Sequence, residues 1–152
     1  PCLTILNGSI SGTRMSYQLT APRTERMIPR HVGSAAVMLN SLHNEGPEYK
    51  PSVYLTDLAA LRAAIEARIT APRYALCTQN PPLRDTLDAL ARFDFWAARA
   101  RLAESVAQGY GWDVIRSFEL LNDPTLINTD GIHPLPAGSG IQANEAWAVC
   151  GL

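Results

Sequence analysis

The sequence predicts an α/β protein in which helices cover a parallel β-sheet. Four short apolar runs rich in β-forming residues alternate with stretches whose apolar residues recur at helical spacing. Strands that alternate with helices are typical of βαβ units, and the strands of such units are parallel. The length of 152 residues and the hydrophobic fraction of 47% suffice for a single domain, residues 1–152, with a buried core.

The four predicted strands are short, and turn-forming residues follow most of them. They are residues 2–6, 34–39, 74–78 and 112–115. The first ends at the turn pair Asn7-Gly8, and the third stops before Asn80 and two prolines. The second is a continuous apolar run, which is typical of a strand covered on both faces.

The predicted helices are residues 12–19, 55–69, 83–108 and 141–149. The second of them has a clear apolar stripe, consisting of Leu55, Leu58, Leu61, Ile65 and Ile69. The third is expected in two pieces that meet near residues 92–94. The last is expected to bury Ile141 and Ala148, which lie two turns apart.

The composition excludes several classes of protein. A net charge of −1 provides no polybasic arm for nucleic acid, and an aromatic content of 7% is too low for a base-stacking platform. No apolar run approaches the roughly 20 residues of a membrane helix. Three widely spaced cysteines, Cys2, Cys77 and Cys150, indicate neither a disulfide framework nor a zinc site. We therefore expect no nucleic-acid partner and no membrane span.

The sharpest candidate for chemistry is Asp130-Gly131-Ile132-His133-Pro134, just before the last predicted helix. An acid three residues ahead of a histidine on a tight loop can accept a hydrogen bond from the ring. This bond fixes the tautomer and leaves the other nitrogen free as a base. The alternative is a turn-forming aspartate beside a surface histidine.

Two further stretches follow predicted strands, where ligands bind in parallel α/β sheets. Residues 42–46 contain Asn44, and a side-chain amide at a strand end is a good donor to an oxyanion. Residues 7–12 contain Gly8 and Gly12, and glycines at a strand-to-helix junction let backbone N–H groups approach an anion. The alternatives are a polar loop for the first stretch and a tight turn with a serine helix cap for the second.

In this order, the three stretches resemble sequence blocks of the SGNH (GDSL-like) hydrolases, a family of esterases and lipases. Residues 127–134 resemble the last block, whose catalytic Asp and His would be Asp130 and His133. Residues 43–46 resemble the third block, with Asn44 as the oxyanion donor, and residues 7–12 the second, with Gly12 as a backbone donor. Residues 78–81 are also similar to a segment of phage-encoded members. The resemblance implies a flavodoxin-like three-layer α/β/α sandwich.

The sequence departs from the family pattern at two places. Leu42 and Glu45 occupy the outer positions of the third block, where the family has glycine and aspartate. The first block, Gly-Asp-Ser, which carries the nucleophile and ends a central strand, is absent; Ser9 is an alternative nucleophile. Without that strand, two strands of the sheet would have unpaired edges. We therefore expect an upstream segment or a partner chain to complete the sheet and supply the serine.

The resemblance implies hydrolysis of an ester, either a carbohydrate O-acetyl group or a lipid ester, through an acylated serine. His133 would act as general base and then acid, Asp130 would orient it, and Asn44 and Gly12 would bind the oxyanion. This mechanism needs no metal or organic cofactor. The alternative from another class is an inactive structural or binding module on the same scaffold, such as a virion component. A weaker one is a binder of small anionic ligands that uses the Gly8–Gly12 turn.

Overall fold

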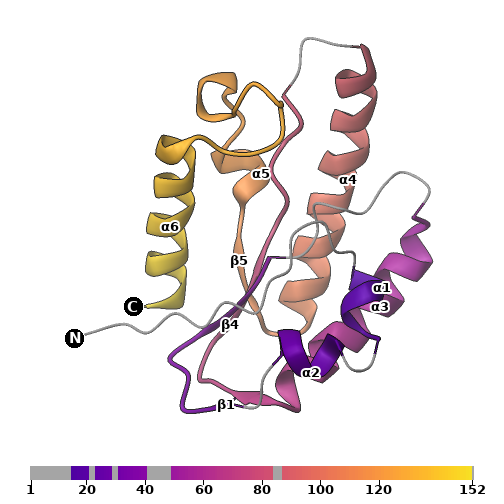
Figure 1. The fold of residues 1–152 in the computed structure, drawn as a ribbon, viewed down its shortest axis with the longest axis vertical. Coiled ribbons are helices and arrows are strands. Elements are labelled where there is room, and N and C mark those ends of the chain that lie inside the picture. The colour runs from indigo at the N-terminus through magenta and orange to yellow at the C-terminus, as the bar shows by residue number, and fades with distance from the viewer. Residues whose placement is uncertain (1–14, 21–22, 29–30, 41–48, 84–86, 152) are drawn as a thin grey trace. The chain divides into compact units, whose positions relative to one another are not determined.

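The computed structural model describes residues 15–20, 23–28, 31–40, 49–83 and 87–151. The chain forms two compact units, the first comprising Pro1–Ser34 and Asn44–Ala71, the second Ala35–His43 and Pro72–Leu152. Figure 1 shows the elements of both. The predicted strand at residues 2–6 and the start of the helix predicted at 12–19 lie outside the described residues.

The second unit is built on a parallel sheet with the order β2-β4-β5. Its strands are β2 (Val37–Leu39), β4 (Tyr74–Cys77) and β5 (Asp113–Ile115). Both pairings are parallel, with Leu39 opposite Leu76 and Cys77 opposite Ile115. The predicted α/β class with a parallel sheet is therefore confirmed, and all the carboxyl ends of these strands lie at one edge.

The second predicted strand is shorter and less covered than expected. Strand β2 has 3 residues, and Met38 in its middle is 51% exposed, so the prediction of cover on both faces is wrong. The physical reason is the cover of the sheet: among the described residues α6 packs on β4 and β5, whereas Met38 on the outermost strand β2 lines the cavity beside this helix. Strand β4, in the middle, has the burial on both faces that its apolar sequence predicts.

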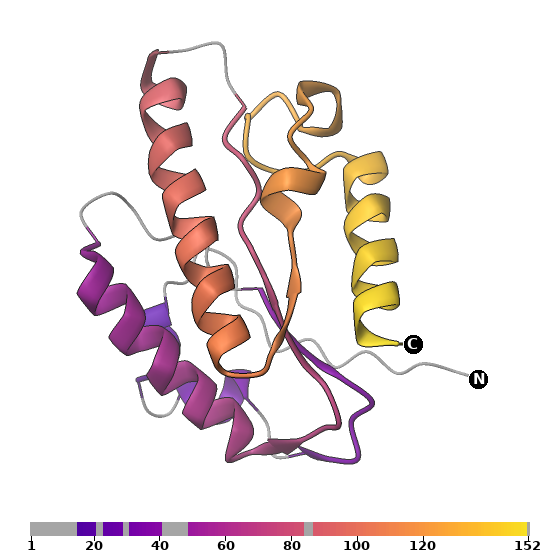
Figure 2. The ribbon, with the colours of Figure 1, turned by 180° about the vertical axis from the view of Figure 1, so that it is seen from behind.

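Helices α4 (Leu87–Gly109) and α6 (Pro136–Cys150) lie on opposite sides of these strands in Figures 1 and 2. On one face, Ala75, Cys77 and Ile115 pack with Cys150 of α6. The neighbouring Leu76 points to the other face because side chains alternate along a strand. Helix α4 presents the buried Ala100, Ala103 and Ala107, whose small side chains allow close approach. The two faces are thus covered by different helices.

Helix α4 is one continuous element of 23 residues, so the prediction of two pieces meeting near residues 92–94 is wrong. The chain contains no proline or glycine between residues 83 and 108 that would break the helix. Phe93 instead packs on Phe118 of helix α5 (Ser117–Leu120), with ring centroids 5.1 Å apart. The helix therefore continues through residues 92–94, where one of its side chains is part of the core.

Helix α6 begins earlier than predicted and buries a different face. Pro136 is its first residue, a position where a missing N–H has no cost. Ile141 is 36% exposed and Ala148 is also exposed, so the predicted buried side is wrong. Ala146, Val149 and Cys150 pack on the sheet instead, where they meet Ala75, Cys77 and Ile115.

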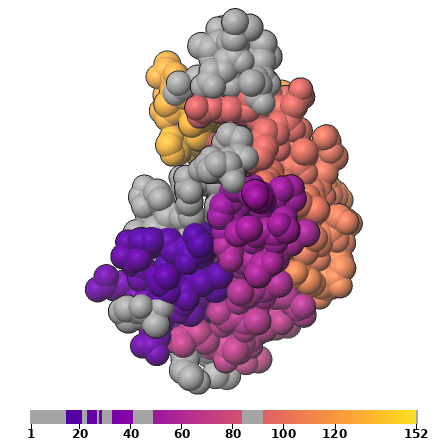
Figure 3. Space-filling model, turned by 90° about the vertical axis from the view of Figure 1, so that its right-hand side faces the viewer, coloured from indigo at the N-terminus to yellow at the C-terminus, as the bar shows by residue number. Residues whose placement is uncertain are grey.

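The first unit contains α1 (Met15–Gln18), α2 (Arg23–Met27), β1 (His31–Val32), α3 (Pro51–Glu66) and β3 (Ile69–Thr70). Strands β1 and β3 pair in parallel. Helix α3 buries Leu58, Leu61 and Ile65 of the predicted stripe, together with Tyr54. Figure 3 shows the exposed surface of helix α3 in magenta. None of the helices in the described part of the chain has the length and hydropathy that a membrane span requires.

The first two turns of α6 contain a matched pair of glycines for a stability test. A Cβ at Gly138 would lie 2.8 Å from the backbone oxygen of Leu126, whereas one at Gly140 would meet nothing within 4 Å. We expect Gly138→Ala to lower the free energy of unfolding by about 1–3 kcal/mol through overpacking. Gly140→Ala should raise it by up to about 1 kcal/mol through helix propensity. Urea denaturation of both variants measures this; equal effects would contradict the close packing of Gly138.

Candidate active site

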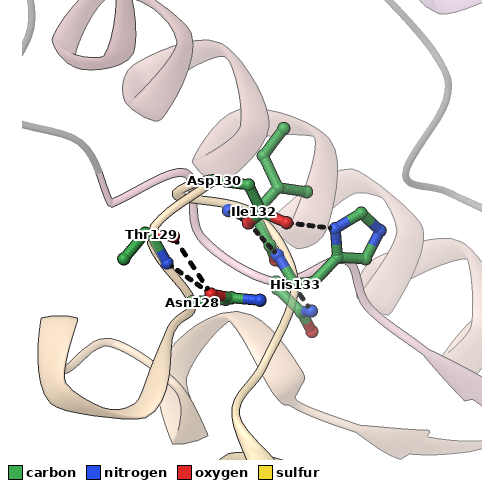
Figure 4. Close-up of polar contacts among 6 residues, drawn as sticks. Asn128, Thr129, Asp130, Ile132 and His133 are labelled. Atoms are coloured by element: carbon green, nitrogen blue, oxygen red, sulfur yellow. Dashed lines mark hydrogen bonds and ion pairs between the residues drawn. The ribbon is translucent and has the colours of Figure 1, made fainter.

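Asp130 and His133 form a hydrogen-bonded pair in the loop between the 3-10 helix η1 (Pro124–Leu126) and α6. The Asp130 Oδ2 atom lies 2.7 Å from His133 Nδ1. The other carboxylate oxygen, Oδ1, accepts from the backbone N–H of Ile132 at 2.8 Å and of His133 at 2.9 Å. Figure 4 shows these bonds. The structure thus contains the bond that the spacing of the two residues predicts.

The environment of Asp130 favours its ionised form. The backbone N–H of His133, the backbone N–H of Ile132 and the His133 ring lower its pKa to about 2. An ionised carboxylate only accepts hydrogen bonds, so His133 Nδ1 is the donor in this pair, and in the neutral ring the lone pair is then on Nε2. The His133 side chain is 77% exposed, which leaves Nε2 accessible to another molecule.

The loop that carries this pair is closed by its own backbone. Ile127 and Pro134 form an antiparallel bridge, and Asn128 N–H donates to the carbonyl of His133 at 2.8 Å. Gly131 lies at the turn with φ of 73°, a left-handed conformation that glycine adopts without strain. Its N–H donates to the Asn128 carbonyl at 2.8 Å. The Asp-to-His spacing is therefore fixed by a short hairpin-like loop.

The segment after β4 supports the loop from outside. Asn80 Nδ2 donates to the carbonyl of Ile132 at 3.3 Å, and Leu83 N–H donates to the carbonyl of Gly131 at 3.0 Å. Gln142 of α6 donates through Nε2 to Asn80 Oδ1 at 2.8 Å. Gln142 has no signal in the sequence, because a glutamine on a helix gives no pattern that would distinguish it from a surface residue.

A cavity of about 210 Å³ lies beside the carboxyl ends of the three strands, on the α6 side of the sheet. Its lining residues are Met38, Asn40, Cys77, Ile115, Ser139, Gln142, Ala143 and Ala146. The Cys77 thiol lies 2.9 Å from the Ser117 hydroxyl, and burial raises the pKa of this thiol to about 11. Cys77 therefore stays protonated at neutral pH, which disfavours a role as a nucleophile.

The other predicted site residues, Gly12, Asn44 and the alternative nucleophile Ser9, lie outside the described residues. Their convergence with His133 stays a prediction. Within the described ranges, no group of three or more His, Cys, Asp and Glu side chains is placed to hold a metal ion.

One solved structure, that of LAE5, described as an alpha/beta hydrolase enzyme from the metagenome of Lake Arreo in Spain, is similar to this chain. The match covers 93% of this chain and 69% of the other, with a TM-score of 0.63 and 21% sequence identity. No protein-family model matches the sequence, and a search of curated proteins found no match. At this identity the likeness establishes the α/β fold alone.

The hydrogen bonds to Asp130 predict its titration. Because its pKa in the folded protein, about 2, lies below the usual value, the ionised carboxylate stabilises the loop at pH values above about 4. That contribution is lost as the pH falls toward 2. Carbon-13 NMR of the side-chain carboxyl should give a midpoint near 2. Asp57, whose pKa is raised by burial, is the internal control; an Asp130 midpoint at or above that of Asp57 would contradict the bonding.

Proposed function

We propose that this protein is a serine-type hydrolase of esters, with His133 as general base and acid. The observation that carries the proposal is the Asp130–His133 pair, in which one ring nitrogen is held by a carboxylate and the other is accessible. This is the arrangement by which an imidazole activates a hydroxyl nucleophile. The likeness of the fold to that of LAE5, which is described as a hydrolase enzyme, is consistent with this proposal.

The reaction would run in two steps, acylation of the serine and then hydrolysis of the acyl-serine. His133 Nε2 removes the proton of a serine hydroxyl as its oxygen attacks the ester carbonyl, and the imidazolium returns that proton to the leaving alcohol. Water then attacks the acyl-serine in the same way and releases the carboxylic acid. Asp130 stabilises the imidazolium in each step, because its carboxylate stays ionised with a pKa of about 2.

The oxyanion of each tetrahedral intermediate would be bound by Asn44 Nδ2 and the backbone N–H of Gly12, as the resemblance to SGNH hydrolases implies. One such donor contributes about 2.7–4 kcal/mol to lowering the barrier. The substrates proposed are a carbohydrate O-acetyl group or a lipid ester.

We also propose that the nucleophilic serine is contributed by a segment other than residues 1–152, either upstream in the chain or on a partner. In the part of the chain that the structure describes, β2 pairs with β4 on one side only, and the 210 Å³ cavity adjoins β2. A parallel strand added at the other side would bring its carboxyl end to the edge of the sheet where Asn40 and Asn80 lie. Ser9 is the alternative.

The first experiment tests the role of His133. We expect the intact protein to hydrolyse 4-nitrophenyl acetate, and His133→Ala to lower kcat/KM by at least about 100-fold through loss of the general base. Asn144→Ala, an exposed change on α6, is the matched control and should keep the activity. Absence of hydrolysis by the wild type would favour the binding-module alternative. Equal activity of His133→Ala would overturn the assignment of His133.

The second experiment locates the nucleophile. A fluorophosphonate probe reacts with an activated serine, so peptide mapping after labelling of the intact protein identifies that residue. We expect the label on a serine outside residues 1–152, with Ser9 unmodified and with labelling lost in His133→Ala. A label on Ser9 would show that the nucleophile belongs to this chain and would refute the proposed additional segment.

A further inference from the structure

We propose that Asn80 and Gln142 form an amide relay that fixes the position of the Asp130–His133 loop. They are then positioning residues for the reaction proposed above, on which their catalytic relevance rests. The relay joins the segment after β4, the loop and helix α6 through side-chain amides.

Each hydrogen bond of the relay has a defined donor and a defined acceptor. Asn80 is only 3% exposed, and its oxygen accepts from Gln142 Nε2 at 2.8 Å. This bond orients the Asn80 amide so that its nitrogen faces Ile132, whose carbonyl accepts at 3.3 Å. Ile132 directly precedes His133, and its N–H donates to Asp130 Oδ1. A shift of Ile132 would therefore move both partners of the pair.

A second contact holds the same loop from the same segment. Leu83 N–H donates to the carbonyl of Gly131 at 3.0 Å, so two consecutive peptide groups between Asp130 and His133 are bound by residues that follow β4. The bonds inside the loop set only its internal shape. The external bonds set where His133 stands relative to the carboxyl edge of the sheet, where a substrate would bind.

An amide is the side chain that this position requires. Asn80 must accept from one neighbour and donate to another, which a carboxylate or an aliphatic side chain cannot do. Loss of either bond would remove a hydrogen bond that holds the buried Asn80 amide against its neighbours. Small displacements of a base from its reacting atom are costly in rate. Gln142 is half-buried, so a change there is better tolerated than one at Asn80.

Hydrogen exchange tests the relay without any assay of activity. We expect Gln142→Met, which keeps the length of the side chain, to speed exchange of the Gly131, Ile132 and His133 amides about tenfold. The amide of Ala103, in the core of α4, should be unchanged. Asn144→Met, an exposed change on the same helix, is the matched control. Loop exchange equal to that of the wild type or of this control would overturn the relay.

Asn80→Leu removes both bonds at similar side-chain volume and should speed loop exchange more than Gln142→Met does. If this variant fails to fold, Gln142→Met alone decides the outcome. In the intact protein, Gln142→Met should lower kcat for 4-nitrophenyl acetate about tenfold with KM unchanged. An unchanged kcat together with faster loop exchange would refute the positioning role.

The two proposals fail separately. If Gln142→Met speeds loop exchange but the wild type hydrolyses no ester, the relay is supported as a structural device and the proposed function is overturned. If the wild type hydrolyses the ester but Gln142→Met leaves loop exchange unchanged, the relay is overturned and the proposed function is supported.

Discussion

The parallel register of β2, β4 and β5 is the constraint on which the rest of the second unit depends. Because the strands run in one direction, their carboxyl ends lie at one edge, and the residues that leave them emerge together. Asn40 after β2, Asn80 after β4 and Ser117 after β5 come from distant parts of the sequence. In an antiparallel arrangement, alternate strands would send these residues to opposite edges.

Two sets of hydrogen bonds hold the Asp130–His133 pair, one within its own loop and one from other segments of the chain. Locally, the carboxylate is bound by the ring and by two backbone N–H groups of its own loop, which keeps it ionised and fixes the tautomer of the ring. At the tertiary level, Asn80 and Leu83 bind the carbonyls of the same loop. The first set defines the chemistry of the pair, and the second defines where that chemistry is presented.

Burial separates the groups that can react from those that only resemble reactive groups. Cys77 and Ser117 form a thiol–hydroxyl pair at 2.9 Å, but both side chains are buried and burial raises the pKa of the thiol. His133 lies in the opposite environment, with an exposed ring beside an ionised carboxylate. The same edge of the sheet therefore contains a buried thiol that stays protonated and an exposed imidazole, and solvent access distinguishes the two.

The sequence alone determined the alternation of strands and helices and the contact of Asp130 with His133, because apolar periodicity and a spacing of three residues are set by local backbone geometry. Two predictions from the sequence were wrong. They concerned the buried face of α6 and a break in α4 at the point where Phe93 packs on Phe118. Only the tertiary structure decided the bonds of Asn80, to residues 52 and 62 positions away. Such pairings depend on how packed strands and helices bring separate segments together, which no local pattern encodes.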